Sequence, residues 1–294
     1  MGMSDHRAEA REFLSSRRAR ITPAQAGLPA YGGNRRVKGL RREEVAMLAG
    51  VSVDYYIRME RGNLAGASDD VLDALARALR LDEAEREHLF ALARSAGPGR
   101  RRRAAPPTTV RPTVQHVLDA IADAPAWVRN GRHDILALNR LGRALYAPVL
   151  ADPRRPANTT RFIYLDPAAR DFFVDWERVA DDAAAMLRLE AGRAPHDQAL
   201  IELVGELSTR SEIFRQRWAS HDVQFHRSGR KRLRHPVVGQ LDLDFESMEL
   251  PSEPGLVLNV YTAPPDSPTA DGLKMLASWA AGEAEDQARA PGKA

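Results

Sequence analysis

The residues whose types and spacing best suit specific hydrogen bonding to another molecule lie in the stretch 41–63. Ser52 can begin a helix there, because its hydroxyl accepts a hydrogen bond from a backbone N–H that the first turn leaves free. In such a helix Tyr56 and Met59 lie three residues apart and face inward. The outer face near the start of the helix then carries Val53, Asp54, Tyr55 and Arg58.

These outer side chains carry groups that can read base pairs in the major groove of DNA. Arg58 can donate two hydrogen bonds to guanine O6 and N7, a contact worth about 1–3 kcal/mol of discrimination. Tyr55 and Val53 can contact thymine methyl groups, and Asp54 can accept from cytosine N4 or orient Arg58. The spacing therefore predicts a DNA recognition helix from Ser52 to Gly62.

Phosphate contacts are expected from polar residues at the two ends of this region. Arg42 lies at the start of the preceding helix, and Arg61 and Asn63 follow the recognition helix directly. For Arg35 and Arg41, a solvated surface position is an equally good interpretation. The predicted DNA-binding residues are Arg42, Ser52, Val53, Asp54, Tyr55, Arg58, Arg61 and Asn63.

Five short helices are predicted to position this surface. Gly50 supplies the left-handed turn between the second and third helices, and Asp82 with Glu85 has the pattern of a capping box. A loop rich in Gly and Pro covers residues 27–39. Apolar spacing and caps predict helices ending before Pro23, over residues 41–49, from Ser52 to Gly62, from Ser68 and from Asp82.

Length and composition favour two domains with different partners. The chain has 294 residues, 44% of them hydrophobic, and no cysteine, which excludes disulfides, thiolate metal sites and a cysteine nucleophile. Residues 1–103 carry a formal charge of +6 and residues 104–294 a charge of −3. The basic first part suits a polyanion, although an uneven surface charge without function is an alternative. The sequence shows no membrane span or signal peptide, so a cytoplasmic protein is expected.

A linker is predicted over residues 96–112, which are rich in Gly, Pro and arginine. Its four arginines, Arg100 to Arg103, either stay solvated or touch DNA phosphates beside the folded domain.

The second part of the chain reads as one antiparallel sheet with helices on one face. Asn130-Gly131 between two apolar pairs predicts a hairpin, and Asn139 can cap the helix that follows. Helices are expected from Asp175, over residues 197–209 and after Ser211. Strands are expected from residue 223, with a turn at Ser228-Gly229, an alternating strand over residues 241–246 and a central strand over residues 256–261.

The chain resembles XRE-type transcription regulators of bacteria, in which a phage-repressor-like helix-turn-helix precedes an MmyB-like ligand-binding domain. Glu60-Arg61-Gly62 matches the Glu-x-Gly that ends the helix-turn-helix pattern. Leu138 departs from the family, whose members usually have tryptophan there, and this leaves the shape of the pocket open. The other matching stretches are Leu40–Ala46, Val51–Tyr56, Asp134–Arg140, Leu165–Arg170 and Lys231–Gly239.

The resemblance implies an α + (α+β) chain: a five-helix DNA-binding domain, then a PAS-like antiparallel sheet with helices on one face. It implies a sensor of a small, largely apolar molecule such as a fatty acid. The predicted domains are the helix-turn-helix domain at residues 6–95, the linker at 96–112, the ligand-binding domain at 113–265, and a C-terminal helix and tail at 266–294.

The predicted ligand-binding residues combine aromatic side chains with two candidates for an acidic head group. The aromatic residues can equally be plain core, and Arg232 and His235, the head-group candidates, can equally be surface charges. The full set is Trp127, Asn139, Phe162, Trp176, Phe214, Trp218, Arg232, His235 and Tyr261.

Enzyme and metal functions find no support in the sequence. No Gly-x-Ser-x-Gly, phosphate loop or dinucleotide fingerprint occurs, and His221, His226 and His235 lack a carboxylate at ligand spacing. No catalytic residue, metal or cofactor is therefore predicted. The expected partners are a double-stranded DNA operator, a small apolar ligand and a second copy of the chain. The alternative is a second domain that only dimerises or binds another protein.

Overall fold

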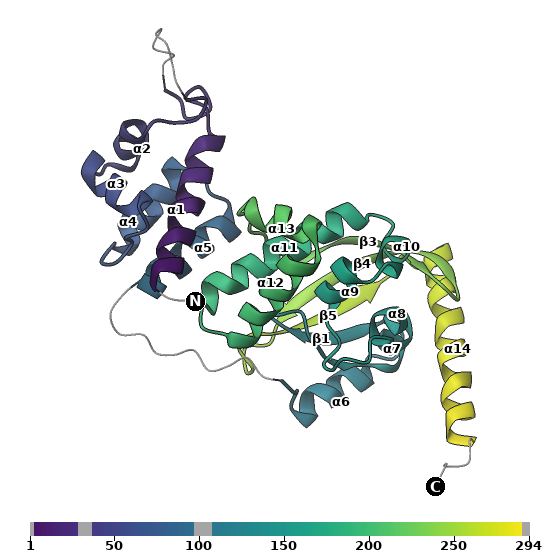
Figure 1. Cartoon of the computed structure of the whole chain (residues 1–294). Helices are drawn as coiled ribbons and strands as arrows, with labels where there is room; N and C mark the ends of the chain where they lie inside the picture. Colours follow the sequence, from purple (N-terminus) through teal and green to yellow (C-terminus); the bar gives the residue numbers. More distant parts are fainter. Residues whose placement is uncertain (1–2, 29–36, 97–107, 290–294) are drawn as a thin grey trace. The chain divides into compact units, whose positions relative to one another are not determined.

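The computed structural model describes residues 3–28, 37–96 and 108–289, which form two compact units (Figure 1). The first, called here the helical unit, comprises residues 1–103, 188–204 and 217–225. The second, called the sheet unit, comprises residues 104–187, 205–216 and 226–294. Two stretches from the second half of the chain thus belong to the unit built on its first hundred residues.

The helical unit contains five helices at its N-terminal end, as the sequence predicted. Ser52 accepts a hydrogen bond from the backbone N–H of Tyr55 at 3.2 Å, and Gly50 ends the preceding helix with a φ of 66°. Both are local signals, which explains why sequence alone located these ends. The helices are α1 (Met3–Arg20), α2 (Arg42–Ala49), α3 (Val53–Glu60), α4 (Asp69–Ala78) and α5 (Glu83–Ala96).

The core of the helical unit is apolar and closely packed, and each of the five helices contributes to it. Leu189 and Val223, from the two later stretches, are buried in the same cluster. Among its fully buried side chains are Phe13, Leu14, Leu40, Val45, Tyr56, Met59, Leu75 and Leu89.

The sheet unit is built on five antiparallel strands in the order β2-β1-β5-β4-β3. The predicted hairpin is confirmed, and β5 lies at the centre as its nearly continuous apolar sequence indicated. The strands are β1 (Ala126–Asn130), β2 (Ile135–Leu138), β3 (Ser228–His235), β4 (Gly239–Glu249) and β5 (Leu256–Thr262).

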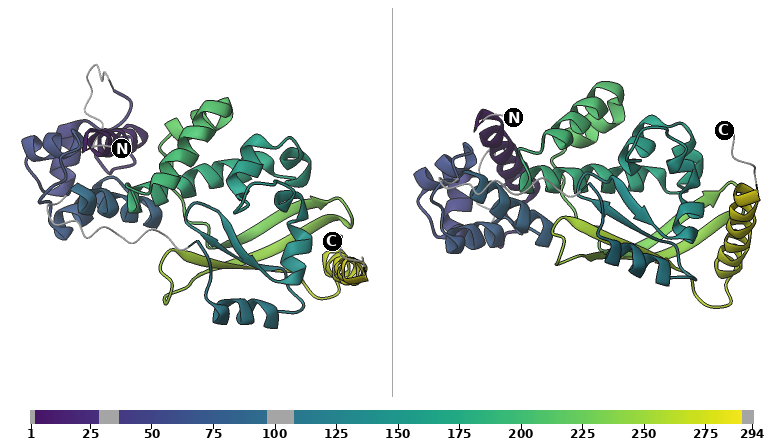
Figure 2. Two further views of the ribbon diagram at one scale, coloured as in Figure 1. Left: turned by 60° about the horizontal axis from the view of Figure 1, so that its bottom comes forward. Right: turned by 90° about the horizontal axis from the view of Figure 1, so that it is seen from below.

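Helices lie on both faces of this sheet (Figure 2). On one face α6 (Pro112–Ala120) buries Leu118 against Val128 and Leu258. The larger core lies on the other face, under α7 (Arg140–Leu145), α8 (Ala147–Leu150), α9 (Thr159–Leu165), α10 (Ala168–Phe172) and the first part of α11 (Trp176–Arg193). The remaining helices are α12 (Gln198–Arg210), α13 (Glu212–Ala219) and α14 (Pro268–Arg289), the last of which packs on α7 and β4.

The predicted fold class is confirmed, with three corrections. Helices were expected on one face of the sheet, but α6 packs on the other face. The turn expected at Ser228-Gly229 is wrong, because both residues pair with β4 as the start of β3. Glycine at this position lets the ring of Phe245 pack close to the backbone of β3, because a Cβ at Gly229 would lie 3.3 Å from that ring. Residues 223–227, expected to be strand, precede β3 as irregular chain.

Candidate nucleic-acid interface and ligand cavity

The outer face of α3 carries the predicted base-reading residues. Val53, Asp54 and Arg58 are exposed, whereas Tyr56 and Met59 are fully buried. The Arg58 guanidinium stacks on the ring of Tyr55, 4.6 Å from its centre. This cation–π contact holds the Arg58 side chain beside the helix, where it can reach a base edge.

A buried carboxylate at the end of α3 orients one predicted phosphate contact. Glu60 is 2% exposed and forms ion pairs with Arg18 of α1, at 2.6 Å, and with Arg42 of α2. The hydrogen bond that Arg42 donates to Glu60 raises the pKa of Arg42. The side chain of Arg42 is 53% exposed, so it presents a fixed positive charge at the surface.

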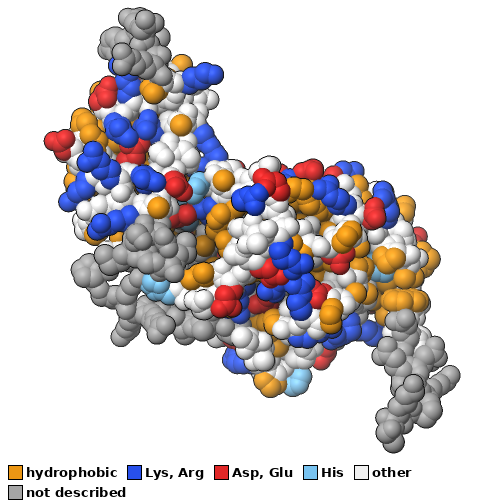
Figure 3. Space-filling view, viewed as in Figure 1, with side chains coloured by type: hydrophobic (Ala, Val, Ile, Leu, Met, Phe, Trp, Pro, Cys, Tyr) orange, Lys and Arg blue, Asp and Glu red, His pale blue; other side chains and the backbone are white. Residues whose placement is uncertain are grey.

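The residues just beyond α3 are also placed by local geometry. Gly62 has a φ of 87°, and a Cβ there would lie 2.0 Å from the backbone oxygen of Arg7. Only glycine fits both conditions. Arg61 is exposed and Asn63 half-buried. Figure 3 shows Lys and Arg side chains gathered on the visible face of this helical region.

The other basic candidates have different outcomes. Arg41 is exposed and lies 3.7 Å from Glu43. Arg35 and the linker run Arg100 to Arg103 lie outside the described residues.

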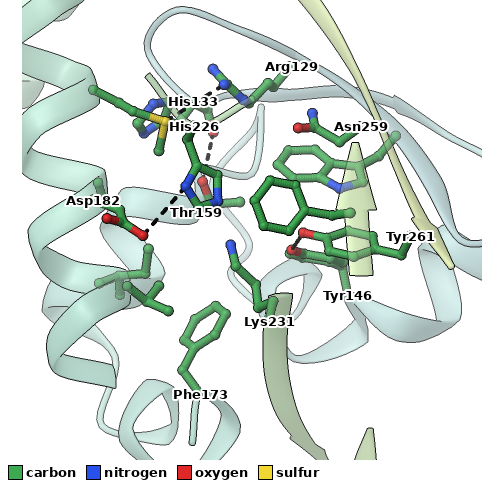
Figure 4. A pocket seen from close by; sticks show the side chains of 16 residues that line it. Arg129, His133, Tyr146, Thr159, Phe173, Asp182, His226, Lys231, Asn259 and Tyr261 are labelled. Atoms are coloured by element: carbon green, nitrogen blue, oxygen red, sulfur yellow. Dashed lines mark hydrogen bonds and ion pairs between the residues drawn. The ribbon is translucent and has the colours of Figure 1, made fainter. Parts of the chain in front are cut away.

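The sheet unit contains a cavity of about 40 Å³ between the sheet and the helices over its larger core (Figure 4). Its volume suits a few water molecules or one small chemical group. The lining residues are Trp127, Arg129, His133, Tyr146, Thr159, Ile163, Phe173, Val179, Asp182, Ala183, Met186, His226, Lys231, Phe245, Asn259 and Tyr261.

Three buried polar atoms of this lining have no hydrogen-bond partner in the described part of the chain. They are Nε1 of Trp127, Nε2 of His133 and Nε2 of His226. An unsatisfied buried polar atom costs about 1–3 kcal/mol, and native interiors contain few of them. Three around one cavity indicate groups that a bound molecule would satisfy.

His133 is held in an unusual conformation at the cavity wall. Its φ is 67°, a left-handed conformation that costs energy for a residue other than glycine. Its Nδ1 lies 2.6 Å from Oγ1 of Thr160, which leaves Nε2 toward the cavity. Burial lowers the pKa of His133 well below its usual value, with Arg129 contributing, so the ring is neutral.

The cavity has an excess of positive charge. Arg129 and Lys231 supply two cations, and Figure 4 shows Lys231 pointing into the middle of the lining side chains. The one carboxyl group is that of Asp182, whose pKa is raised by burial against the opposing effect of Lys231. Burial, then Lys231 and Arg129, lower the pKa of His226 to about 2.

The neutral ring of His226 is fixed on two sides. Its Nδ1 lies 3.4 Å from a carboxylate oxygen of Asp182, and the ring stacks on Phe245 with centres 4.3 Å apart. In the tautomer that places the proton on Nδ1, toward this carboxylate, Nε2 is a hydrogen-bond acceptor. The cavity thus offers cations for an acidic group and an acceptor for a hydroxyl or N–H group.

Two of the nine predicted ligand-binding residues, Trp127 and Tyr261, line the cavity. The hydroxyl of Tyr261 lies 2.6 Å from that of Tyr146. Burial, and then Tyr261, raise the pKa of Tyr146 well above its usual value, so its hydroxyl stays protonated.

Asn139 has a structural position. Its side-chain oxygen accepts from the backbone N–H groups of Gly142 at 2.7 Å and Ala126 at 3.0 Å. Its amide donates to the carbonyls of Ile121 and Ala124, each at 2.7 Å. Asn139 therefore caps α7 and joins it to the start of β1.

Both predicted head-group residues lie away from the cavity lining. Arg232 forms an ion pair with Asp175 on the outer side of β3. His235 is buried, with Nε2 3.1 Å from the carbonyl oxygen of Ala144. Lys231, one position before Arg232, faces the opposite side of the strand and reaches the cavity, because side chains alternate along a strand.

The remaining predicted aromatic residues pack elsewhere. Phe162 and Trp176 are buried in the core of the sheet unit, where Nε1 of Trp176 donates to the carbonyl of Ile163 at 3.0 Å. Phe214 is fully buried and meets Tyr164 edge-on. Trp218 belongs to the helical unit, where Arg188 stacks on its ring at 4.0 Å.

Sequence reasoning missed the polar part of the lining, namely Arg129, His133, Asp182, His226 and Lys231. One signal was available. Lys231 shares its strand face with the apolar Leu233, so the sequence indicated a charged side chain on the inward face of this strand. No sequence pattern singles out the other four, which come from β1, the turn that follows it, α11 and the segment before β3.

Two family models match the chain. A model described as the MmyB-like transcription regulator ligand binding domain matches residues 110–276, and a helix-turn-helix domain model matches residues 9–89. Among curated proteins, none matches the chain. In the described residues no helix has the length and apolarity to cross a membrane, and no group of three or more His, Asp or Glu is arranged to hold a metal ion.

Proposed function

Because the chain belongs to the MmyB-like transcription regulators, we propose that it senses a small molecule in its sheet unit and adjusts DNA binding accordingly. The ligand combines an apolar body with an acidic group, and a fatty acid is one member of this class. The cavity of about 40 Å³ has room for the acidic group, and its lining side chains must move apart to admit the rest of the chain. The protein works as a DNA-binding regulator in the bacterial cytoplasm, where its operator lies.

The observation that carries the ligand proposal is the set of unpartnered polar atoms around the cavity. Nε1 of Trp127 and Nε2 of His133 and His226 are buried beside the cations Arg129 and Lys231. A domain that only dimerises has no reason to keep three such atoms around one cavity, since apolar side chains would fill it at lower cost. An acidic group would accept from Nε1 of Trp127 and pair with the two cations, and a hydroxyl or N–H group of the ligand would donate to Nε2 of His226.

DNA recognition is assigned to α3 and its neighbours. Arg58, held by Tyr55, reads a guanine, and Val53 contacts a thymine methyl group. Arg42, oriented by Glu60, and Arg61 bind phosphates and set the register of α3 on the duplex. Ser52, Asp54 and Asn63 complete the proposed surface.

The ligand proposal is tested by titrating the full chain with dodecanoate in a calorimeter. The matched pair of variants is Lys231→Met, which removes a cavity cation, and Arg230→Met, which removes the outward-facing neighbour paired with Asp244. Lys231→Met is expected to weaken binding by about 10- to 100-fold, since a hydrogen bond to a charged group is worth about 1.5–3 kcal/mol. Arg230→Met should bind as the wild type does.

The same samples are then used with DNA fragments from the region upstream of the coding sequence. Dodecanoate is expected to change the affinity of the wild type and to leave that of Lys231→Met unchanged. The ligand proposal fails if neither a panel of organic acids nor a solvent extract of the purified protein yields a bound molecule. The sheet unit would then be better interpreted as a dimerisation or protein-interaction module.

A further inference from the structure

Helix α11 belongs to both compact units. In its first part Val179, Asp182, Ala183 and Met186 line the cavity of the sheet unit, at spacings of three, one and three residues that keep them on one side of the helix. From Arg188 onward the same helix belongs to the helical unit. One continuous backbone therefore runs from the cavity wall into the DNA-binding unit.

The end of α11 is tied to α1 and α5. Arg188 is 2% exposed, forms an ion pair with Glu9 of α1 and donates to the carbonyl of Trp218. Leu189 is buried in the apolar core of the helical unit. Gly192 lies so close to His88 of α5 that a Cβ would be 2.6 Å from the imidazole.

A second connection runs through residues 221–226. Nε2 of His221 lies 2.9 Å from a carboxylate oxygen of Glu12, and its Nδ1 lies 3.7 Å from Glu9. Val223 is buried in the core of the helical unit. His226, three residues later, lines the cavity and contacts Asp182.

The two connections therefore meet at both ends. In the sheet unit they are joined by the contact between Asp182 of α11 and His226. In the helical unit they converge on Glu9, which Arg188 and His221 approach from the two connections. Burial alone would raise the pKa of Glu9, but the nearby imidazoles of His221 and His88 and the charge of Arg188 lower it, so the carboxylate stays ionised.

From Glu9 the structure continues to the recognition helix through α1. Arg18 of α1 forms an ion pair with Glu60 at the end of α3. The backbone of Arg7 packs against Gly62, directly after α3. A displacement of α1 therefore changes the support of the helix that carries Arg58.

We propose that occupancy of the cavity is transmitted to the DNA-reading helix through α11 and residues 221–226, with Glu9 of α1 as the receiving residue. This mechanism rests on the proposed function for its physiological ligand. A ligand that binds His226 or Lys231 changes the contact between Asp182 and His226. Helix α11 and residues 221–226 then shift relative to each other, and this shift changes how Arg188 and His221 hold Glu9.

The test uses a cavity-filling substitution in place of the unidentified ligand. Ala183→Leu adds side-chain volume to the cavity from α11. The matched control Ala169→Leu adds the same volume to the core of the sheet unit from α10, away from the cavity lining. Amide hydrogen exchange of the full chain reports protection in α1 and α3. We expect Ala183→Leu to change this protection by about 5- to 150-fold, the usual range of coupling between sites, and Ala169→Leu to leave it unchanged.

The receiving residue is tested by combining the cavity substitution with Glu9→Gln. The effect of Ala183→Leu on α1 and α3 should disappear in this background and persist in the background of the exposed Glu43→Gln. If Glu9→Gln does not fold, Arg188→Lys serves instead, because it keeps the charge and loses the two-pronged contact with Glu9 and Trp218.

An unchanged effect of Ala183→Leu in the Glu9→Gln background, or no effect of Ala183→Leu in the wild type, overturns the mechanism. These readouts need no ligand, so they remain informative if every acid fails to bind. Conversely, dodecanoate binding without any change of protection in α1 would refute this transmission while the ligand site stands.

Discussion

Arg58 and Tyr55 act together at the surface of α3. A guanidinium stacked on a ring loses less freedom when it meets a base than one that moves in solvent. The contact thus prepares Arg58 for a two-pronged hydrogen bond to guanine. The ring of Tyr55 keeps its own apolar edge available for a thymine methyl group.

Replacing Arg58 by alanine is expected to relax specificity at one base pair. The loss is about 1–3 kcal/mol of discrimination, or about 5- to 150-fold, at the guanine that Arg58 reads. Selection from random DNA sequences, followed by affinity measurements across a salt series, checks this. Arg77→Ala, an exposed change on α4, is the control, and equal base preferences in Arg58→Ala and wild type would contradict the assignment.

His226 makes the stability of the sheet unit depend on pH. Its pKa is about 2 in the folded chain because burial, Lys231 and Arg129 disfavour the charged ring, against an ordinary value of 6.5. As pH falls below 6.5, the unfolded state takes up a proton that the folded state refuses. Stability is therefore lost as pH falls, and the buried His133 acts in the same direction.

The expected slope for His226 is about 1.4 kcal/mol per pH unit below 6.5. Urea unfolding of wild type and His226→Phe at several pH values between 7 and 5 measures it. The variant should lose less stability than the wild type over this range, and His116→Phe, at an exposed position, is the matched control. Parallel curves for wild type and His226→Phe would show that His226 is not held neutral.

At the scale of elements, one carboxylate ties three helices together. Glu60 at the end of α3 binds Arg18 of α1 and Arg42 of α2 in a nearly dry position. The pair adds little net stability compared with apolar packing, but its loss leaves a buried charge without a partner. The angle between α2 and α3, which sets the DNA-reading surface, depends on this contact.

Glu60→Ala is therefore expected to lower the free energy of unfolding by about 3–5 kcal/mol, because Arg18 is left buried without its partner. Arg42→Ala should cost less, since Arg42 is half-exposed and the Arg18–Glu60 pair remains. Urea denaturation of the full chain compares them, with the exposed Glu43→Ala as control. A cost below about 1 kcal/mol for Glu60→Ala would place the contact among weak surface pairs.

At the scale of the whole molecule, we expect the proposed regulator to work as a homodimer. Dimeric helix-turn-helix proteins read two half-sites about one DNA turn apart, roughly 34 Å. A single α3 contacts few base pairs, so one copy gives little discrimination against a genome. If α1 is coupled to the cavity, a bound ligand would then change the affinity of the dimer for DNA that carries two half-sites.

Light scattering after size exclusion is expected to give twice the chain mass of 32.5 kDa at micromolar concentration. Lengthening the spacer between half-sites by about five base pairs, half a helical turn, should abolish tight binding, because the second α3 then faces the wrong side of the duplex. A monomer mass together with spacing-independent binding would contradict the dimer.

The sequence by itself determined the elements whose signals are local. Ser52, Gly50 and the spacing of Tyr56 and Met59 predict α3 and its exposed face, since caps, turns and helical periodicity involve neighbours within four residues. The alternation of residues 241–246 likewise predicts β4. These features placed the proposed DNA-reading surface on the outer face of α3 before any tertiary contact was known.

Only the tertiary structure decided the cavity and the set of residues that line it. His133, Asp182 and Lys231 lie far apart in sequence, and their meeting depends on strand order and on which helix covers which face. Asn139 shows the converse: it was included among the predicted ligand-binding residues, but four backbone groups occupy its side chain, which caps α7 as its sequence position indicated. Long-range packing, which no local pattern encodes, sets which polar atoms remain for a ligand.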